Sequence, residues 1–298
     1  MASDELNVAV AVATRDRPVS CRRLIGALLA QELPDEWQLR IIVVNNDPSG
    51  SELDLPSDSR LEVLHEPEPG IPFARNRGVE RALPWADVIA FIDDDEAASP
   101  SWLRTLVEGL DRYDADVVSG PIISVFPTGT PTWITEHPVF QRRLRHPGEQ
   151  LTETYTGNTA ARSEVFADGR RFAPEFRTTG GSDTHLFRQA HQAGARIRWV
   201  AEAVVEESVS AERARVGWIL TRSFRIGANR VQFLRAGPAP ATRWLTIVAG
   251  SGAELLLGLA SPVVAIASRR QALVLLGRAA RGLGTYAALF GVRYSAYR

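Results

Sequence analysis

The sequence of 298 residues predicts an α/β fold, with a mostly parallel central sheet flanked by helices, followed by a helical C-terminal extension. Short apolar runs rich in Val and Ile alternate with helical patterns in the first half, which is typical of βαβ units. The run at residues 7–13 is continuous, as expected of a strand that is buried on both faces of a parallel sheet. The last third has long apolar and arginine-rich stretches instead, which predicts a separate helical part.

Each element of the first part follows from its own pattern. Residues 7–13 form a Val- and Ala-rich run, and residues 88–92 form another that stops at three consecutive aspartates. Helices are indicated where apolar residues recur at helical spacing after a polar break. The predicted strands are 7–13, 40–44, 61–64 and 88–92, and the predicted helices are 20–31 and 72–82.

The middle of the chain predicts fewer regular elements. Segment 121–153 contains many Pro, Thr and Arg residues and has weak periodicity, so we expect a long loop with short elements. The other expected elements are helices at 100–112 and 183–193 and strands at 115–119, 196–200 and 203–205.

The charge is unevenly distributed. The formal net charge of −1 gives the whole chain no preference for polyanions, so no nucleic-acid partner is expected. Beyond Glu212, however, the only acidic residue is Glu254, while arginines continue to Arg298. This end is therefore expected to meet an anionic surface, such as membrane lipid or a phosphorylated substrate, unless its arginines simply solvate helix faces.

The C-terminal region has helical periodicity at 214–233, with Trp218, Leu220, Phe224 and Ile226 as its apolar positions. A linker with Pro238 and Pro240 follows, and then an apolar stretch at 244–268.

The stretch at 244–268 is long enough to span a bilayer, which needs about 20 apolar residues. Glu254 and Pro262 argue against a simple span, and Arg243 and Arg269 at its ends suit a surface-lying or re-entrant helical pair on anionic lipid. The alternative is a helical hairpin that covers a core or forms a dimer interface; we favour membrane contact.

The single cysteine and the composition of the N-terminus indicate the cellular compartment of the protein. Cys21 is the only cysteine, which excludes an intrachain disulfide. Residues 1–6 are polar and acidic and do not resemble a signal peptide. We expect a cytoplasmic protein, with the inner face of the cell membrane as an alternative.

The strongest chemical signal is Asp93-Asp94-Asp95 at the end of a buried strand. Ligands bind at the carboxyl edge of an open α/β sheet, and clustered carboxylates there favour a hard divalent cation. An acidic cap region before the next helix is the alternative.

Two further features are weaker. The strand ends at Thr14-Arg15 and Asn45-Asn46-Asp47 would flank the same edge and read a nucleobase, although both are also ordinary turns. Segment 179–183 opens a helix with two glycines and Asp183, which suits either substrate approach or a helix cap. No Walker-type or dinucleotide-type glycine loop is present.

In this order the segments resemble family-2 glycosyltransferases of the GT-A fold, over roughly residues 8–205. The motifs that carry the resemblance are Ala13-Thr14-Arg15-Asp16-Arg17-Pro18, Val43-Val44-Asn45-Asn46-Asp47, Ala74-Arg75-Asn76-Arg77-Gly78, Phe91-Ile92-Asp93-Asp94-Asp95, Gly157-Asn158-Thr159-Ala160 and Gly181-Ser182-Asp183.

The resemblance implies an inverting transfer of a sugar from a nucleotide-diphosphate donor to an acceptor hydroxyl. Asp93 would contact the ribose or the metal, Asp95 would bind Mn²⁺ or Mg²⁺, and Asp183 would be the catalytic base. The nucleotide pocket would be lined by Thr14, Arg15, Asn45 and Arg75.

The chain departs from the family pattern at three places. Asn45 replaces the usual Asp that accepts from the base, and Ser182 replaces the usual acid before Asp183. Glu206 and Glu207 stand where many relatives have a His, and an acid would have to substitute for it at the metal.

The resemblance also implies the organisation. A catalytic domain is expected at 1–210, with nucleotide-sugar binding in 1–120 and the acceptor side in 121–210, and a basic, apolar extension at 211–298. The acceptor would be a glycan, a lipid-linked sugar or a small molecule, in bacterial polysaccharide, glycolipid or specialised-metabolite glycosylation.

Two other functions fit the sequence less well. A nucleotidyltransferase on a similar fold would need a glycine-rich loop after the first strand, which segment 14–20 lacks. A catalytically inactive nucleotide-binding or scaffold protein is disfavoured because Asp93, Asp95 and Asp183 are all present.

Overall fold

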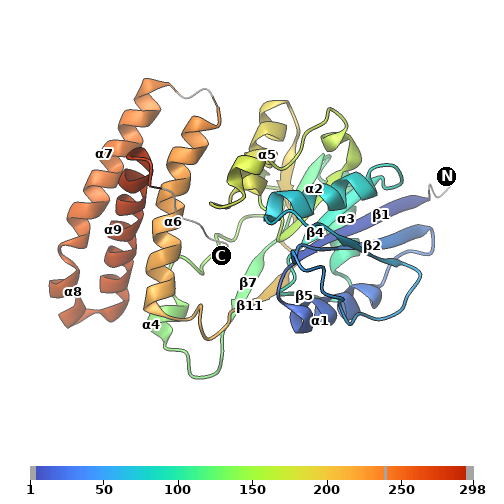
Figure 1. Ribbon diagram of the computed structural model, residues 1–298, viewed down its shortest axis with the longest axis horizontal. Helices are drawn as coiled ribbons and strands as arrows, with labels where there is room; N and C mark the ends of the chain where they lie inside the picture. Colours follow the sequence, from blue (N-terminus) through green and yellow to red (C-terminus); the bar gives the residue numbers. More distant parts are fainter. Residues whose placement is uncertain (1–4, 238–239, 293–298) are drawn as a thin grey trace. The chain divides into compact units, whose positions relative to one another are not determined.

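The computed structural model describes residues 5–237 and 240–292, so that Pro238 of the predicted linker and Arg298 lie outside the described residues (Figure 1). The packing of the chain separates two compact units. Unit 1 comprises Met1–Ile123, Arg143–Arg177 and Gly181–Ser208, and unit 2 comprises Ser124–Arg142, Thr178–Gly180 and Val209–Arg298.

Unit 1 is built on a mixed, mostly parallel sheet of eight strands in the order β3-β2-β1-β4-β9-β6-β10-β8. Neighbours from β3 to β4 run parallel, whereas β9 is antiparallel to both β4 and β6. The strands are β1 (Leu6–Thr14), β2 (Trp37–Asn45), β3 (Leu61–His65), β4 (Val88–Ile92), β6 (Val117–Ser119), β8 (Gln150–Leu151), β9 (Asn158–Arg162) and β10 (Ile197–Trp199).

Helices cover both faces of this sheet. The helices of unit 1 are α1 (Pro18–Leu29), α2 (Ile71–Ala82), α3 (Trp102–Arg112) and α5 (Ser182–Gln192), with short 3₁₀ turns η1 (Ser163–Phe166) and η2 (Pro174–Phe176).

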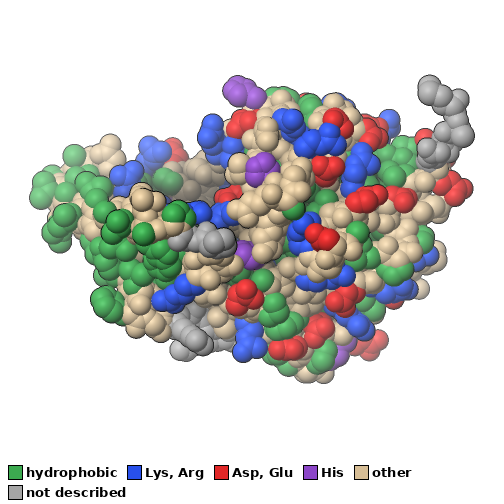
Figure 2. Space-filling view, turned by 90° about the horizontal axis from the view of Figure 1, so that it is seen from above, with side chains coloured by type: hydrophobic (Ala, Val, Ile, Leu, Met, Phe, Trp, Pro, Cys, Tyr) green, Lys and Arg blue, Asp and Glu red, His purple; other side chains and the backbone are tan. Residues whose placement is uncertain are grey.

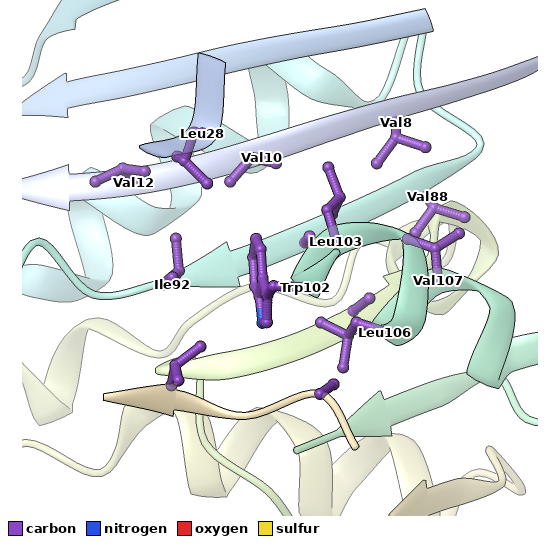
Figure 3. Packing of buried hydrophobic residues seen from close by; sticks show 14 of the residues in the cluster. Val8, Val10, Val12, Leu28, Val88, Ile92, Trp102, Leu103, Leu106 and Val107 are labelled. Carbon is purple, nitrogen blue, oxygen red and sulfur yellow. The ribbon is translucent and has the colours of Figure 1, made fainter. Parts of the chain in front are cut away.

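Strand β1 shows why its apolar run has no polar alternation. Val8, Val10 and Val12 pack on one face against Leu28 of α1 and Trp102 of α3 (Figure 3). The intervening alanines pack on the other face with residues of α2 and α5. Because both faces are covered, Val8 to Val12 are all buried, and the predicted α/β fold with a mostly parallel sheet flanked by helices is confirmed.

A small second sheet has the order β5-β11-β7, with β5 (Glu96–Ala98), β11 (Val205–Ser208) and β7 (Ile122–Val125). The strand predicted at 203–205 is therefore shifted toward the C-terminus. Glu206 and Glu207 belong to β11 because their backbone pairs with β5. The Glu206 side chain is exposed, so its charge stays in water.

Unit 2 contains the short helices α4 (Thr132–Thr135) and α8 (Ser261–Ala267) and the long helices α6 (Val216–Arg235), α7 (Ala241–Gly258) and α9 (Arg269–Leu289). Helix α9 packs against α6, α7 and α8 (Figure 1). Its contact with α6 depends on glycine, since a Cβ on Gly284 would lie 1.9 Å from the carbonyl oxygen of Phe224.

The buried face of α6 differs from the predicted one, and this close approach is the reason. Ile226 was expected on the apolar face, but it is 40% exposed. Small residues allow the backbones to approach where bulky side chains would hold them apart. The buried residues of α6 are Ile219, Ser223, Gly227, Ala228, Val231 and Leu234.

Candidate functional site

The end of β4 gathers charged groups at the carboxyl edge of the sheet of unit 1. Parallel pairing sets Thr14 of β1 opposite Asn45 of β2, and β4 runs parallel to β1 on its other side. The ends of these strands therefore lie at one edge, which is where ligands bind in open α/β sheets.

Asp94 is the buried member of the acidic triplet, with an exposed fraction of 4%. Thr14 Oγ1 donates to Asp94 Oδ2 at 2.7 Å, and Arg17 Nη1 donates to Asp94 Oδ1 at 2.8 Å. The same nitrogen of Arg17 donates to Asp95 Oδ2 at 2.9 Å. Arg17 thus joins the loop after β1 to two of the three aspartates.

Burial and charge oppose each other in this cluster. Burial raises the pKa of Asp94, although Arg17 and the Thr14 hydroxyl act to lower it. Burial alone would lower the pKa of Arg17, but the neighbouring aspartates outweigh it and the pKa is raised. Arg17 therefore stays charged and acts as the internal counter-ion of the acidic strand end.

Arg75 of α2 brings the strand end together with the start of α5. Its Nη2 donates to Asp93 Oδ1 at 3.1 Å, and its Nη1 lies 3.7 Å from Asp183 Oδ2. The Arg75 side chain is only 11% exposed, whereas that of Asp93 is 44% exposed. Three residues that are distant in the sequence thus form one charged site, with Asp93 open to solvent.

Asp183 is the second residue of α5 rather than its cap. The chain enters the helix through Gly180 and Gly181 at φ +76° and +96°, a conformation that side chains with a Cβ rarely adopt. Asp183 thereby lies in the first turn of α5, where the helix dipole favours a negative charge, and it faces Arg75.

Thr14, Arg15 and Asn45 were predicted to line a nucleotide pocket, and each of them contacts a different partner in the structure. Thr14 is bonded to Asp94 as described, and Arg15 pairs with its neighbour Asp16 at 3.3 Å. Asn45 uses both ends of its amide inside the following turn, donating to Ser51 O at 2.7 Å and accepting from Asp47 N at 3.0 Å.

Two buried polar residues, Glu96 and Asn158, make hydrogen bonds near the end of β4. Glu96, 1% exposed, accepts a hydrogen bond from the backbone nitrogen of Asp93 at 2.9 Å. Asn158 is fully buried and accepts from Trp102 Nε1 at 2.9 Å, while its own amide donates to the carbonyl of Ala203 at 2.6 Å. The Gly157-Asn158 segment therefore holds neighbouring elements in place.

The donor set suits a divalent cation that shares its coordination with a phosphate. Asp93 and Asp95 supply hard oxygen donors two residues apart, the ligand type that Mg²⁺ and Mn²⁺ take from proteins. Within residues 5–237 and 240–292, no group of three or more His, Cys, Asp or Glu side chains is arranged to hold a metal ion. Two carboxylates completed by substrate phosphates and water are a usual arrangement for Mg²⁺.

Glu207 lies near this site through backbone pairing, because β11 sets it opposite Glu96 of β5. Its side chain is partly exposed, and that of Glu206 points to solvent. The substitution of an acid for the missing His stays a prediction.

The carboxyl edge of the sheet thus carries an acidic strand end beside a helix start, and the sequence comparison gives the class of protein. Residues 9–173 match the family described as "Glycosyl transferase family 2", and the chain belongs to this family. It is a glycosyltransferase, as the resemblance predicted.

Two curated relatives show how far the similarity extends. The "Succinoglycan biosynthesis protein ExoM" of Rhizobium meliloti (strain 1021) is 30% identical over 302 residues, covering 98% of this chain and 96% of that protein. The "Glucosyl-dolichyl phosphate glucuronosyltransferase" of Haloferax volcanii is 27% identical over 261 residues, covering 76% of each chain.

Solved structures support the fold. The crystal structure of S. aureus TarS has a TM-score of 0.53 at 16% identity and covers 95% of this chain and 55% of that one. Its fragment 1–349 has a TM-score of 0.52 at 12% identity and covers 94% and 91%. At this identity the likeness shows the fold alone, and it confirms the GT-A fold.

Proposed function

We propose that the chain catalyses inverting transfer of a sugar from a nucleotide-diphosphate sugar to an acceptor hydroxyl. The observation that carries this proposal is the guanidinium of Arg75, which contacts Asp93 at the donor edge of the sheet and lies near Asp183 at the start of α5. A donor-binding acid and a candidate base are thereby held within one small region of unit 1. An inactive scaffold would not need this arrangement.

In the proposed reaction Asp183 takes the proton from the acceptor hydroxyl as its oxygen attacks the anomeric carbon. The bond from that carbon to the diphosphate oxygen breaks, and the nucleoside diphosphate leaves with the electron pair. A positioned carboxylate base contributes about 10²–10⁴-fold to the rate. Arg75, whose Nη1 lies 3.7 Å from Asp183 Oδ2, would hold this carboxylate in position until the acceptor arrives.

The residues that would hold a divalent cation are Asp93 and Asp95. Mn²⁺ or Mg²⁺ bound there would offset the negative charge that develops on the leaving diphosphate. Thr14, Arg15, Asn45 and Arg75 are proposed to line the donor nucleotide. Arg17, which lies on Asp94 and Asp95, is suited to take diphosphate oxygens as well, since a guanidinium matches phosphate geometry.

The relatives suggest the class of acceptor. One is named for succinoglycan biosynthesis and another for transfer to glucosyl-dolichyl phosphate, so a growing polysaccharide or a lipid-linked sugar is the proposed acceptor. TarS 1–349 has been solved with UDP-GlcNAc, which makes this compound a reasonable first donor to test.

The donor site is tested by calorimetric titration with a panel of nucleoside diphosphates, with and without Mn²⁺. Wild type is compared with Asp95→Asn and with the matched control Asp54→Asn, whose side chain is 86% exposed. We expect binding that requires Mn²⁺, that weakens at least about tenfold in Asp95→Asn and that is unchanged in the control, because the metal links protein and diphosphate. If wild type binds no nucleotide under either condition, the proposal fails.

The base is tested separately with Asp183→Asn. This variant should bind the donor as wild type does, yet transfer sugar about 10²–10⁴-fold more slowly, since only the proton acceptor is lost. Transfer at the wild-type rate would remove Asp183 from the mechanism.

A further inference from the structure

Helix α7 presents an apolar face to the outside of unit 2. Leu245, Ala249, Ala253 and Leu256 recur at intervals of three and four residues, and all four are exposed. The exposed fractions of the two leucines are 69% and 70%. A helix on the surface of a water-soluble protein normally shows the opposite pattern, with polar residues outside.

The apolar face continues onto α8. Leu259, Val263 and Ile266 have exposed fractions of 77%, 72% and 89%. Figure 2 shows hydrophobic side chains gathered over the helices of unit 2. We call this surface, formed by Leu245, Leu256, Leu259, Val263 and Ile266, the α7–α8 face.

The single acid of this region does not interrupt the α7–α8 face. Glu254 accepts from Arg230 of α6 at 3.0 and 3.1 Å and from Arg281 of α9 at 2.8 and 2.9 Å, and its side chain is 15% exposed. It thus points toward the packed interior of unit 2, with its charge matched. The objection that a carboxylate opposes lipid contact at 244–268 therefore does not apply to the outer face.

Positive charge borders the face. Arg243 lies near the start of α7 and Arg269 is the first residue of α9, separated from the end of α8 by one residue, and both are exposed. Since Glu254 is turned inward, no acidic side chain beyond Glu212 balances these arginines on the outside of the described helices. Anionic lipid headgroups would supply the missing counter-charge, at about 1 kcal/mol for each basic residue near the surface.

We propose that the α7–α8 face lies in the interface of an anionic phospholipid bilayer, with α7 and α8 along the surface. Among the described helices none is long and apolar enough to span a bilayer alone, and the α7–α8 pair that passes together is bent by 53°. The opposite side of α7 packs on α6 and α9, where Glu254 pairs with Arg230 and Arg281, so only the outer side is available to lipid. A large apolar face with arginines beside it is typical of helices that lie in the membrane interface.

A second copy of the chain fits the face less well. A symmetric dimer would bring Arg243 and Arg269 of both copies to the same border, with no acid on the described outer face to pair with them. Like charges across an interface oppose association. The arginines thus favour lipid over a second copy.

The test is flotation of the full chain with vesicles of phosphatidylcholine, with and without phosphatidylglycerol. Wild type should float with the anionic vesicles and at least about tenfold less with the neutral ones, because the arginines contribute to binding. The double variant Leu259→Glu/Ile266→Glu should stay in the protein fraction. Leu144→Glu makes the same change at a leucine of unit 1 that is 64% exposed, and it should float like wild type.

Three results would overturn the proposal. The first is that wild type floats with neither kind of vesicle, and the second is that the double variant still floats. The third is that wild type binds no vesicle but is a dimer in light scattering, and that the double variant is a monomer. Circular dichroism of both variants, together with the milder Val263→Asn, establishes that lost flotation is not lost folding. Nucleotide titration without lipid tests the proposed function independently of this result.

Discussion

At the scale of single residues, Arg17 is the group on which the acidic strand end depends. It donates to both Asp94 and Asp95, and Asp94 is buried. Arg17→Ala would remove the charged donor to the Asp94 carboxylate and leave it the hydrogen bond from the Thr14 hydroxyl. We expect the free energy of unfolding to fall by about 1–3 kcal/mol, the usual cost of an unsatisfied buried polar group, as measured by urea denaturation.

The control for this variant is Arg22→Ala. The Arg22–Asp54 pair is exposed at both side chains, 54% and 86%, and exposed pairs contribute about 0–1 kcal/mol. Equal effects of the two variants would show that Arg17 is a surface arginine like any other and would contradict its role as counter-ion.

Cys21 gives a second prediction at this scale. It is fully buried beneath the same strand end, and burial raises the pKa of its thiol to about 11. The folded chain keeps the thiol proton to higher pH than the unfolded chain, so the stability that this adds is present at neutral pH and is lost as the pH rises toward 11. We expect negligible alkylation by iodoacetamide at neutral pH and complete alkylation in urea.

The matched variant Cys21→Ala should show a flatter dependence of the urea midpoint on pH above the ordinary range of a thiol. Rapid alkylation of the native protein, or an unchanged pH dependence in Cys21→Ala, would contradict a buried neutral thiol.

At the scale of elements, the packing of α6 on α9 depends on glycine. A Cβ at position 284 would lie 1.9 Å from Phe224 O, and backbone cannot yield as a flexible side chain does. Gly284→Ala should therefore lower the melting temperature of the protein through overpacking, which costs about 1–3 kcal/mol. Calorimetry measures the change.

The control is Gly250→Ala on α7, where a Cβ would meet nothing within 4 Å. There the same substitution should raise stability by about 0.5–1 kcal/mol, because alanine is the better helix former. A stabilising Gly284→Ala would mean that the two helices do not approach so closely.

Elements whose patterns are local were predictable from the sequence. The apolar run at 88–92 coincides with β4, and the first three strands were located to within a few residues. Strand β9 was not predicted, because its residues Asn-Thr-Ala-Ala-Arg have little intrinsic strand preference and are extended only through pairing with β4 and β6. Strand β5 was missed for the same reason.

The same limit applies to the candidate site. The sequence identified Asp93, Asp95, Asp183 and Arg75 through motifs, but it did not indicate that the Arg75 guanidinium connects Asp93 with Asp183. Arg17 was seen only as part of a loop motif, since its ion pairs join positions that are 77 and 78 residues apart. Local periodicity carries no information on such contacts.

At the scale of the whole molecule, each unit has its own apolar clusters and its own proposed partner. The apolar clusters against α1 and α3 and against α2 and α5 belong to unit 1, whereas Ile219 and Leu273 belong to a cluster in unit 2. The donor site is made from unit 1 alone, and the α7–α8 face from unit 2 alone. A nucleotide and a lipid surface should therefore act on different parts of the chain.

Hydrogen–deuterium exchange tests this separation. A ligand that binds the native state slows the openings through which amides exchange. Nucleoside diphosphate with Mn²⁺ should protect the ends of β1 and β4 and the first turn of α5, while exchange in α7 and α8 stays unchanged. Anionic vesicles should protect α7 and α8 and leave those strand ends as they were.

The variants described above make the result unambiguous. Asp95→Asn should abolish the protection by nucleotide but keep that by vesicles, and Leu259→Glu/Ile266→Glu should do the reverse. If nucleotide protected α7 and α8 in wild type, the two functions would be coupled across the chain, since a ligand slows exchange at a remote site only by changing the local stability there. Protection that is confined to each unit would mean that lipid contact supplies a location for the enzyme and leaves donor affinity unchanged.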